Sequence, residues 1–266
     1  MRALLAFAAL LLFATPAAAD RFALTYDGLG LGFVPVGGVT VDADVSEDSY
    51  DISASLQSRG ILNLFERTNI QANSSGLINN GTVRWQRYNL DHHYSRKRRV
   101  ISMSADMHGA ITSEIEPIYR TWGDPAATEE QRRISRDPLS NVVAMAIDVG
   151  RSRRCEGTYP TFDGRFHYLL QLSGGDTDDF EGGGYQGEVL KCDLAYIAVS
   201  GFNQRDAGRR RIPEGEIWFA LMPDTTFAPP VRISTPLSAG GATIRLASFR
   251  RARVDVEYTS DTSASP

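Results

Sequence analysis

Alternation of apolar and polar side chains at every second residue is the feature that most limits the folds open to this chain. Residues 39–45 and 50–56 both alternate in this way, and the four residues between them, Ser46-Glu47-Asp48-Ser49, are typical of a turn. A period of two places alternate side chains on opposite faces of a strand. We therefore predict a β-hairpin with one buried face and one solvated face.

The same period recurs along the rest of the chain. Residues 82–88 alternate after Asn79-Asn80-Gly81, which is a strong turn signal. A second tight hairpin is predicted at Asp163-Gly164. Further strands are predicted at residues 99–103, 166–172, 185–199, 216–221, 231–234, 242–249 and 254–258. Strands at this spacing are typical of an antiparallel sheet that curls or closes, so we predict a mainly β fold.

Few helices are predicted. Asp137 supplies a capping carboxylate, Pro138 stands at the first helical position, and apolar residues then follow at helical spacing until Gly150 ends the run. Shorter helices are predicted at residues 61–66 and 128–134. An apolar helix has to bury its stripe, and the concave face of the sheet is the surface available for it.

The remaining segments are interpreted as loops and tails within one domain. Residues 173–184 are rich in Gly and Asp, and we predict a mobile loop there. Residues 259–266 are small and polar, which favours a disordered tail. Because no linker or internal repeat divides the chain, we predict a single domain over residues 20–258.

The N-terminus has the pattern of a secretory signal peptide. Met1-Arg2 is basic, Ala3–Phe13 is an unbroken apolar run, and Ala17-Ala18-Ala19 offers the small residues that signal peptidase requires. The alternative, a buried N-terminal helix, fits this pattern poorly. The apolar run is shorter than the roughly 20 residues that span a bilayer. We therefore predict that residues 1–19 are removed after Ala19 and that the chain is exported.

Charge restricts the partners of the mature chain. Removal of Arg2 leaves 27 basic residues against 32 acidic ones. This balance argues against nucleic acid as a partner, because a nucleic-acid-binding domain is strongly basic. No second apolar run approaches membrane-spanning length, so we predict no transmembrane segment after cleavage.

The two cysteines predict a disulfide bond. Cys155 and Cys192 are the only cysteines, and an even number in an exported chain favours pairing. The catalytic alternative lacks support, because there is no C-x-x-C motif and no histidine stands beside either thiol in the sequence.

Several segments occur in an order that is specific when they are taken together. They are residues 26–32 (YDGLGLG), 137–140 (DPLS), 162–165 (FDGR), 185–187 (YQG), 218–220 (WFA) and 230–233 (PVRI). In these segments, from about Phe22 to Phe249, the chain resembles an uncharacterised family of exported Gram-negative proteins, domain-of-unknown-function family 3108. The resemblance implies a periplasmic protein with a fold similar to that of periplasmic lipoprotein carriers. Such a fold is a strongly curved antiparallel sheet, or half-open barrel, with a few short helices on its concave face, and it binds acyl chains or hydrophobic peptides.

Catalytic motifs are absent from the sequence. The adjacent His92 and His93 would point to opposite faces of a strand, and no H-x-x-x-H or H-E-x-x-H motif exists. The positions around Ser200 that a nucleophile elbow fills with glycine hold Ala198 and Phe202. We therefore predict no enzyme, no catalytic residue and no cofactor.

Two acidic segments are candidate calcium sites. Residues 42–48 begin like an EF-hand loop, but Glu47 stands where glycine is required and Ser53 where the bidentate glutamate is required. Residues 176–181 offer four carboxylates without a defined geometry. A solvated acidic loop explains both segments, and we predict no metal site.

A basic run offers a candidate contact to anionic lipid. Arg96, Lys97, Arg98 and Arg99 directly precede an apolar strand, and arginine binds phosphate in a bidentate manner. We interpret these four residues as candidate partners of an anionic head group. The alternative is a solvated polar surface, since alternation along a strand would spread the charges over both faces.

Apolar residues of the helices and strands are candidates to line a cavity under the curved sheet. They are Leu64, Phe65, Trp85, Leu139, Val143, Ile147 and Trp218. An open cavity would favour a non-catalytic protein that binds a lipid or another hydrophobic ligand, such as a lipoprotein acyl chain. A filled one would make the same residues ordinary core. It would favour a structural cell-envelope protein that binds another envelope protein.

Overall fold

The computed structural model describes residues 18–60, 67–236 and 240–255, and strands dominate them. The strands are β1 (Ala18–Gly30), β2 (Val34–Val45), β3 (Ser49–Ser58), β4 (Thr68–Asn79), β5 (Thr82–Tyr94), β6 (Lys97–Ala105), β7 (Ile111–Glu116), β8 (Gly157–Phe162), β9 (His167–Gly182), β10 (Tyr185–Ser200), β11 (Gly215–Ala220), β12 (Pro230–Thr235) and β13 (Ala242–Asp255). The helices are α2 (Glu129–Arg133), α3 (Pro138–Ser152), α4 (Ala207–Arg210) and the 3-10 turn η1 (Gln204–Asp206).

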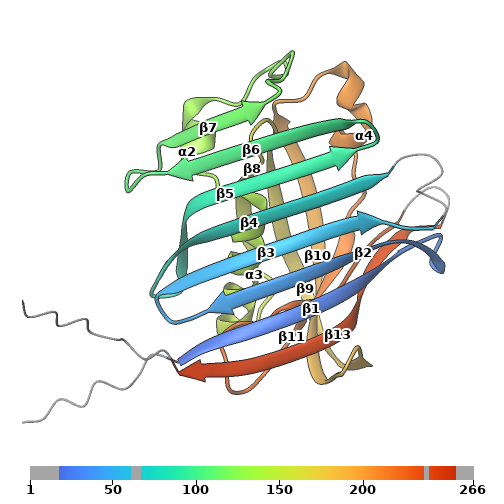
Figure 1. Cartoon of the computed structure of the whole chain (residues 1–266). Coiled ribbons are helices and arrows are strands. Elements are labelled where there is room, and N and C mark those ends of the chain that lie inside the picture. The colour runs from blue at the N-terminus through green and yellow to red at the C-terminus, as the bar shows by residue number, and fades with distance from the viewer. Residues whose placement is uncertain (1–17, 61–66, 237–239, 256–266) are drawn as a thin grey trace, which may run out of the picture.

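All thirteen strands belong to one antiparallel sheet, ordered β7-β6-β5-β4-β3-β2-β1-β13-β12-β11-β10-β9-β8 (Figure 1). Strands that are neighbours in the sheet are also consecutive in the chain, except at the β1–β13 pair, where Phe22 lies opposite Arg251. The end strands β7 and β8 do not pair with each other, so the sheet is not closed. The predicted fold class is thus confirmed.

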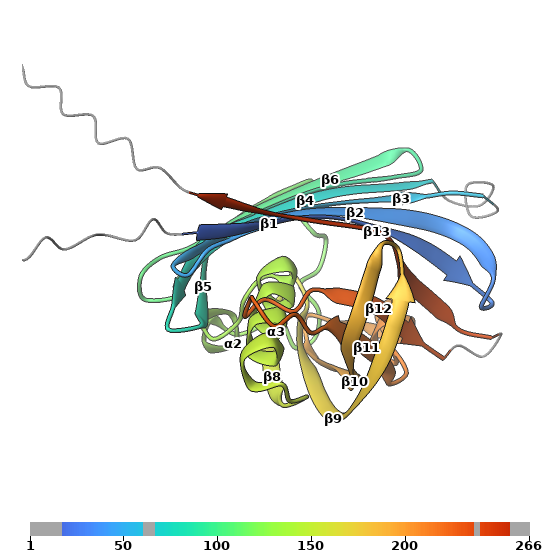
Figure 2. The same ribbon diagram turned by 90° about the horizontal axis from the view of Figure 1, so that it is seen from below.

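The sheet folds back over one helix. Figure 2 shows α3 beneath the layer formed by β1–β6, with β8–β12 turned back below the same layer. The predicted hairpin at residues 39–56 forms β2 and β3, with Val41 opposite Ala54. The predicted helix at 128–134 is α2, which Thr128 caps. The predicted helix at 61–66 and the tail at 259–266 lie outside the described residues.

Helix α3 begins as the sequence predicts but ends later. The Asp137 side chain accepts hydrogen bonds from the backbone N–H groups of Leu139 and Ser140, both at 3.0 Å, which satisfies two of the donors at a helix start. The prediction that Gly150 ends the helix is wrong, because α3 continues to Ser152. A Cβ atom at Gly150 would lie 2.1 Å from the carbonyl oxygen of Thr226. This glycine therefore permits a close approach of two backbones.

The predicted mobile loop at residues 173–184 is largely strand, which corrects our interpretation. Strand β9 runs to Gly182, and Asp178 lies opposite Val189 of β10. Only Gly183 and Gly184, with φ of 60° and 83°, form the turn. A long two-stranded ribbon pairs backbone groups and so tolerates acidic side chains that face water.

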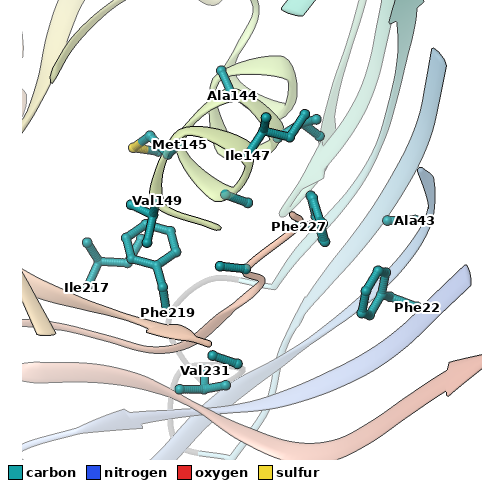
Figure 3. Close-up of a cluster of buried hydrophobic side chains, with 14 of the residues drawn as sticks. Phe22, Ala43, Ala144, Met145, Ile147, Val149, Ile217, Phe219, Phe227 and Val231 are labelled. Atoms are coloured by element: carbon teal, nitrogen blue, oxygen red, sulfur yellow. The ribbon is translucent and has the colours of Figure 1, made fainter. Parts of the chain in front are cut away.

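The main core lies between α3 and both halves of the sheet. Val143 and Val149 of α3 and Phe219 of β11 are fully buried. Figure 3 shows Val149 directed at Phe219 and Ile217, while Phe22 and Phe227 lie on the side of β1. The ring centres of Phe22 and Phe227 are 5.0 Å apart. The apolar stripe of α3 is therefore a filled core.

The predicted disulfide bond is confirmed. Cys155, just after α3, is bonded to Cys192 of β10, with a Cα–Cα distance of 5.4 Å. Both cysteines are buried. The bond therefore attaches the end of the central helix to the half of the sheet that folds back beneath it.

Candidate functional site

The residues predicted to line one cavity lie in different surroundings. The Val143 and Ile147 side chains are 0% and 3% exposed within the main core. Trp85 belongs to a second core cluster, and its indole Nε1 donates a hydrogen bond to the Ser135 carbonyl oxygen at 3.0 Å. Leu139 packs against both clusters. The space beneath the centre of the sheet is thus occupied by protein side chains.

Trp218 is only partly buried, and it packs against the main core without being one of its buried members. Its strand neighbours Ile217 and Phe219 are buried, and alternation turns the indole of Trp218 to the opposite face of β11. There the guanidinium of Arg232 lies 4.7 Å from the indole centre. Leu64 and Phe65, the remaining two candidates, lie outside the described residues.

A cleft of about 620 Å³ opens at the end of strands β4–β6 where β4 begins. One wall consists of residues from β4, β5 and β6, and the other comes from the β8–β9 turn, from η1 and α4, and from Tyr119 after β7. Its lining residues are Thr68, Ile70, Leu90, His92, Tyr94, Arg99, Ile101, Tyr119, Asp163, Arg165, Phe166, Arg205, Asp206 and Arg209. This volume lies in the range of small-molecule sites, about 300–1,000 Å³.

The strand wall of the cleft contains three aliphatic side chains. Ile70, Leu90 and Ile101 come from three neighbouring strands, and Leu90 lies directly opposite Ile101 in the sheet. Phe166 adds a buried ring that is stacked on Phe202 at 4.5 Å. These side chains form an apolar surface that a hydrocarbon chain can contact without losing hydrogen bonds.

Cationic groups and aromatic rings form the other part of the cleft. The guanidinium of Arg99 lies 3.9 Å from the centre of the Tyr119 ring, and that of Arg165 lies 5.2 Å from it. Arg165 and Arg209 lie 4.7 and 5.4 Å from the Phe166 ring. Such cation–π contacts hold a guanidinium in place and leave its N–H groups free to bind an anion.

Local turns position these side chains. The Asp163 carboxylate accepts hydrogen bonds from the backbone N–H groups of Arg165 and Phe166, at 2.9 and 2.8 Å. This contact fixes the turn that leads into β9. The segment that carries Tyr119 is held against the end of β10, where the backbone N–H of Asp124 donates to the carbonyl oxygen of Phe202 at 2.9 Å.

The cleft carries an excess of positive charge. Its lining includes four arginines and two aspartates. Asp206 pairs with Arg165 at 2.9 Å. Among the described residues, no carboxylate lies within ion-pair distance of Arg99, Arg205 or Arg209. Burial raises the pKa of the Asp163 carboxyl, and hydrogen bonds from the backbone N–H groups of Phe166 and Arg165 oppose this rise.

The predicted head-group run is divided by the structure. Arg99 enters the cleft, and its Nε donates to the carbonyl oxygen of Pro117 at 3.2 Å. Arg98 forms a two-pronged pair with Asp91, with both distances 2.8 Å, and this pair lowers the pKa of Asp91 to about 2. Arg96 and Lys97 are exposed at the turn between β5 and β6.

A second hollow, of about 400 Å³, lies beside the cleft and shares Arg165 with it. Ile115, Ile118, Trp122 and Phe162 make most of its lining apolar. Ile118 and Trp122 are well exposed. The surface around Arg165 therefore combines a fixed cation with apolar hollows on two sides.

Sequence reasoning found parts of this site but not the site itself. The arginines at 99 and 209 belong to basic runs that the sequence displays. The turn signal at Asp163-Gly164 predicted a hairpin but not a site, and nothing in the sequence pointed to Tyr119. Within the described residues, no group of three or more His, Cys, Asp or Glu side chains is arranged to hold a metal ion.

A buried polar network lies at the start of α3 and serves the helix. The Asp137 carboxylate accepts hydrogen bonds from the hydroxyls of Ser74, at 2.9 Å, and of Ser140. Tyr50 Oη lies 2.6 Å from Ser140 Oγ. Burial raises the pKa of Asp137 to about 6. These groups cap α3 and attach it to β3 and β4.

The fold and cleft define an open antiparallel sheet wrapped round one helix, with an amphipathic, cationic hollow at one end. The chain belongs to the DUF3108 family of proteins of unknown function, whose model matches residues 21–247. The expected family is thus confirmed. No curated protein matches the chain significantly.

One solved structure similar to this chain is the crystal structure of a beta-barrel-like protein of the domain of unknown function DUF1849 from Brucella abortus. The two share 7% sequence identity, with a TM-score of 0.47, and the match covers 89% of this chain and 98% of that one. In the described part of this chain, no helix is long and apolar enough to cross a membrane.

Proposed function

We propose that this protein is exported to the periplasm and there binds, without catalysis, a lipid or other hydrophobic ligand that carries an anionic head group. The observation that supports this proposal is the cleft at the end of β4–β6, where three aliphatic side chains line the same hollow as Arg99 and Arg209, for which the described residues supply no carboxylate at ion-pair distance. An acyl chain fits the surface of Ile70, Leu90 and Ile101. A carboxylate or phosphate fits Arg99 and Arg209.

The charge of the cleft favours an anion over a neutral ligand. Removing an arginine from water is costly unless an anion replaces its hydration. The overall chain has 28 basic and 32 acidic residues, so an excess of arginine in one hollow is a local arrangement. Arg99 is already fixed by Tyr119, which reduces the entropy that a ligand would have to remove.

Two features support export. The first 19 residues have the pattern of a signal peptide, and the disulfide bond is of a kind that persists in oxidising compartments. The periplasm is such a compartment in Gram-negative bacteria.

Native mass spectrometry tests the proposed function. The protein is exported in a Gram-negative host, purified without detergent, measured intact, and then extracted with organic solvent to identify any bound lipid. We expect an additional mass that extracts as an anionic lipid or fatty acid. If the protein is recovered empty, it is titrated with a long-chain fatty acid and with phosphatidylglycerol. Failure to bind either probe would refute the proposal.

Matched variants locate the binding site. Arg99→Gln and Arg209→Gln each remove one cation from the cleft, and we expect ligand affinity to fall about tenfold or more, since a hydrogen bond to a charged group contributes about 1.5–3 kcal/mol. Arg210→Gln is the control, because Arg210 is exposed on the same helix but does not line the cleft. Equal loss in all three variants would contradict binding at this cleft.

A second candidate function is attachment to another envelope protein without a small-molecule ligand. The observation that favours it is the outer edge of β7, which no strand pairs with in the described sheet. An extended segment of a partner can add to such an edge. Recovery of an empty protein together with a stoichiometric protein partner would support this function in place of the first.

A further inference from the structure

Several turns lie together at one end of the sheet. Thr68 pairs with Tyr94, and Tyr94 pairs with Lys97, so the start of β4, the end of β5 and the start of β6 share this end. The β1–β2 turn, residues 31–33, belongs to the same end, because Gly37 of β2 pairs with Ser58 of β3. Figure 1 shows these turns on the right of the sheet. We call this region the β1–β2 end of the molecule.

The β1–β2 turn exposes two large apolar side chains. Leu31 is 51% exposed and Phe33 is 76% exposed. Leu31 also has φ of 52°, a left-handed conformation that Gly or Asn adopts at lower cost. A hairpin turn of this kind requires neither leucine nor phenylalanine. Their contribution to the stability of the fold is therefore small, which points to a use outside the fold.

Basic side chains also stand in other connections at this end of the sheet, and one of them, Arg59, lines a hollow together with Phe33. Arg59 and Arg67 flank the β3–β4 connection, Arg96 and Lys97 form the β5–β6 turn, and the exposed residues 209–211 are all arginine. The corresponding turns at the opposite end of β2–β7 contain Glu47, Asp48 and Asp106 but neither Lys nor Arg. The turn residues are thus basic at the end that exposes Leu31 and Phe33 and acidic at the opposite end, where Arg84 and Arg151 reach the turns from β5 and α3.

We propose that the β1–β2 end docks onto the surface of an anionic phospholipid bilayer. Leu31 and Phe33 would enter the interface between head groups and acyl chains, and the basic side chains of the other connections at this end would contact lipid phosphates. Apolar insertion and electrostatic attraction add in this kind of binding. The proposal goes beyond ligand binding, because docking does not require an occupied cleft. It would also bring the cleft, which Thr68, Tyr94 and Arg209 line from this same end, close to the bilayer.

Vesicle co-sedimentation tests the proposal. The exported protein, with its N-terminus identified by mass spectrometry, is mixed with vesicles of phosphatidylglycerol and phosphatidylcholine in equal parts, and separately with phosphatidylcholine alone. We expect binding to the anionic vesicles that weakens with added salt and is at least about tenfold weaker on phosphatidylcholine. Absence of binding to the anionic vesicles at low salt would overturn the proposal.

The Leu31→Asn, Phe33→Ser double variant tests the role of the turn. Asparagine suits the left-handed conformation at position 31, so we expect the melting temperature to stay within a few degrees of the parent. We expect vesicle binding to fall about tenfold or more. Met107→Ser is the control, because Met107 is 75% exposed on a turn at the opposite end. A double variant that binds vesicles as the parent does would overturn the proposal.

The two proposals fail in different ways. If docking is wrong and ligand binding is right, the parent carries lipid in native mass spectrometry but does not sediment with vesicles. If ligand binding is wrong and docking is right, the empty parent sediments, and Arg99→Gln retains full vesicle binding because that side chain faces the cleft.

Discussion

The guanidinium of Arg99 lies 3.9 Å from the centre of the Tyr119 ring, although the two residues come from different segments of the chain. Arg99 belongs to β6, whereas Tyr119 follows β7 in an irregular segment. The contact therefore attaches β6 to the irregular segment that follows β7. The same contact therefore stabilises this region and positions Arg99, the cation that we assign to ligand binding.

Replacement of Tyr119 tests this contact. Tyr119→Leu removes the ring, and we expect a loss of about 1 kcal/mol in the free energy of unfolding from the cation–π contact, with further loss from packing. Tyr119→Phe retains the ring and serves as the control. Urea denaturation measures both variants. Equal stability of the leucine and phenylalanine variants would contradict a role for the ring face.

The disulfide bond makes a separate contribution. Cys192→Ser opens the link between the end of α3 and β10, and we expect the free energy of unfolding to fall by roughly 2–5 kcal/mol. Chemical denaturation under oxidising conditions measures the difference, and the parent with its disulfide reduced should match the variant. A variant as stable as the oxidised parent would show that the bond is dispensable.

Packing under the sheet predicts the effect of truncating α3. Ile147→Ala removes a side chain that is 3% exposed in the main core, and we expect a cost of about 2–5 kcal/mol. Ile134→Ala is the control, because Ile134 is 57% exposed and its loss should change stability by about 0.5 kcal/mol at most. A small effect at Ile147 would instead indicate space beneath the sheet.

Asp137 predicts a dependence of stability on pH. Its pKa in the folded protein is about 6, above the ordinary value of 3.8, because burial disfavours the charged form. A raised carboxyl pKa contributes stability that is present below pH 3.8 and is lost as the pH rises through 6. The loss amounts to up to about 3 kcal/mol.

Comparison with Asp137→Asn isolates this group from other titrations. We expect the free energy of unfolding of the parent, minus that of the variant, to fall between about pH 4 and pH 6 and then to level off. Urea denaturation across this range provides the measurement. A difference that rises with pH would show that the folded-state pKa of Asp137 is lowered.

Gly150 predicts a reversal of the usual helix preference. Alanine in place of glycine inside a helix commonly stabilises it by about 1 kcal/mol. Here the added Cβ would lie 2.1 Å from the carbonyl oxygen of Thr226, and a backbone atom cannot rotate away. We therefore expect Gly150→Ala to lower the melting temperature. An increase would contradict the close approach of the two backbones.

Local signals predicted much of the fold. The alternation at residues 39–56 correctly predicted β2 and β3, and the Asp137-Pro138 pair correctly predicted the start of α3. Two predictions that rested on glycine are wrong. Gly150 does not end α3, and the glycine-rich residues 173–184 are largely strand rather than loop. In both places a partner far away in the sequence determines the structure. The carbonyl group of Thr226 packs against Gly150, and β10 pairs with residues 173–182.

The cleft could be predicted only in part for the same reason. Arg99 and Arg209 stand in basic runs, but nothing in the sequence brings the two runs together. The face of Trp218 was likewise beyond prediction, because a single aromatic residue in a short strand gives no indication of which side is buried. Its neighbours Ile217 and Phe219 determine that side once the sheet is formed.

The pairing of β1 with β13 also has a kinetic consequence. The strands β1–β7 and β8–β13 can each form from neighbours along the chain, but the two halves join only where Phe22 meets Arg251. Contacts this far apart in sequence form slowly, since a long loop has to close first. Until β13 arrives, the outer edge of β1 is open to strands of other molecules. The seam between the first and last strands is thus the point at which slow folding would turn into aggregation.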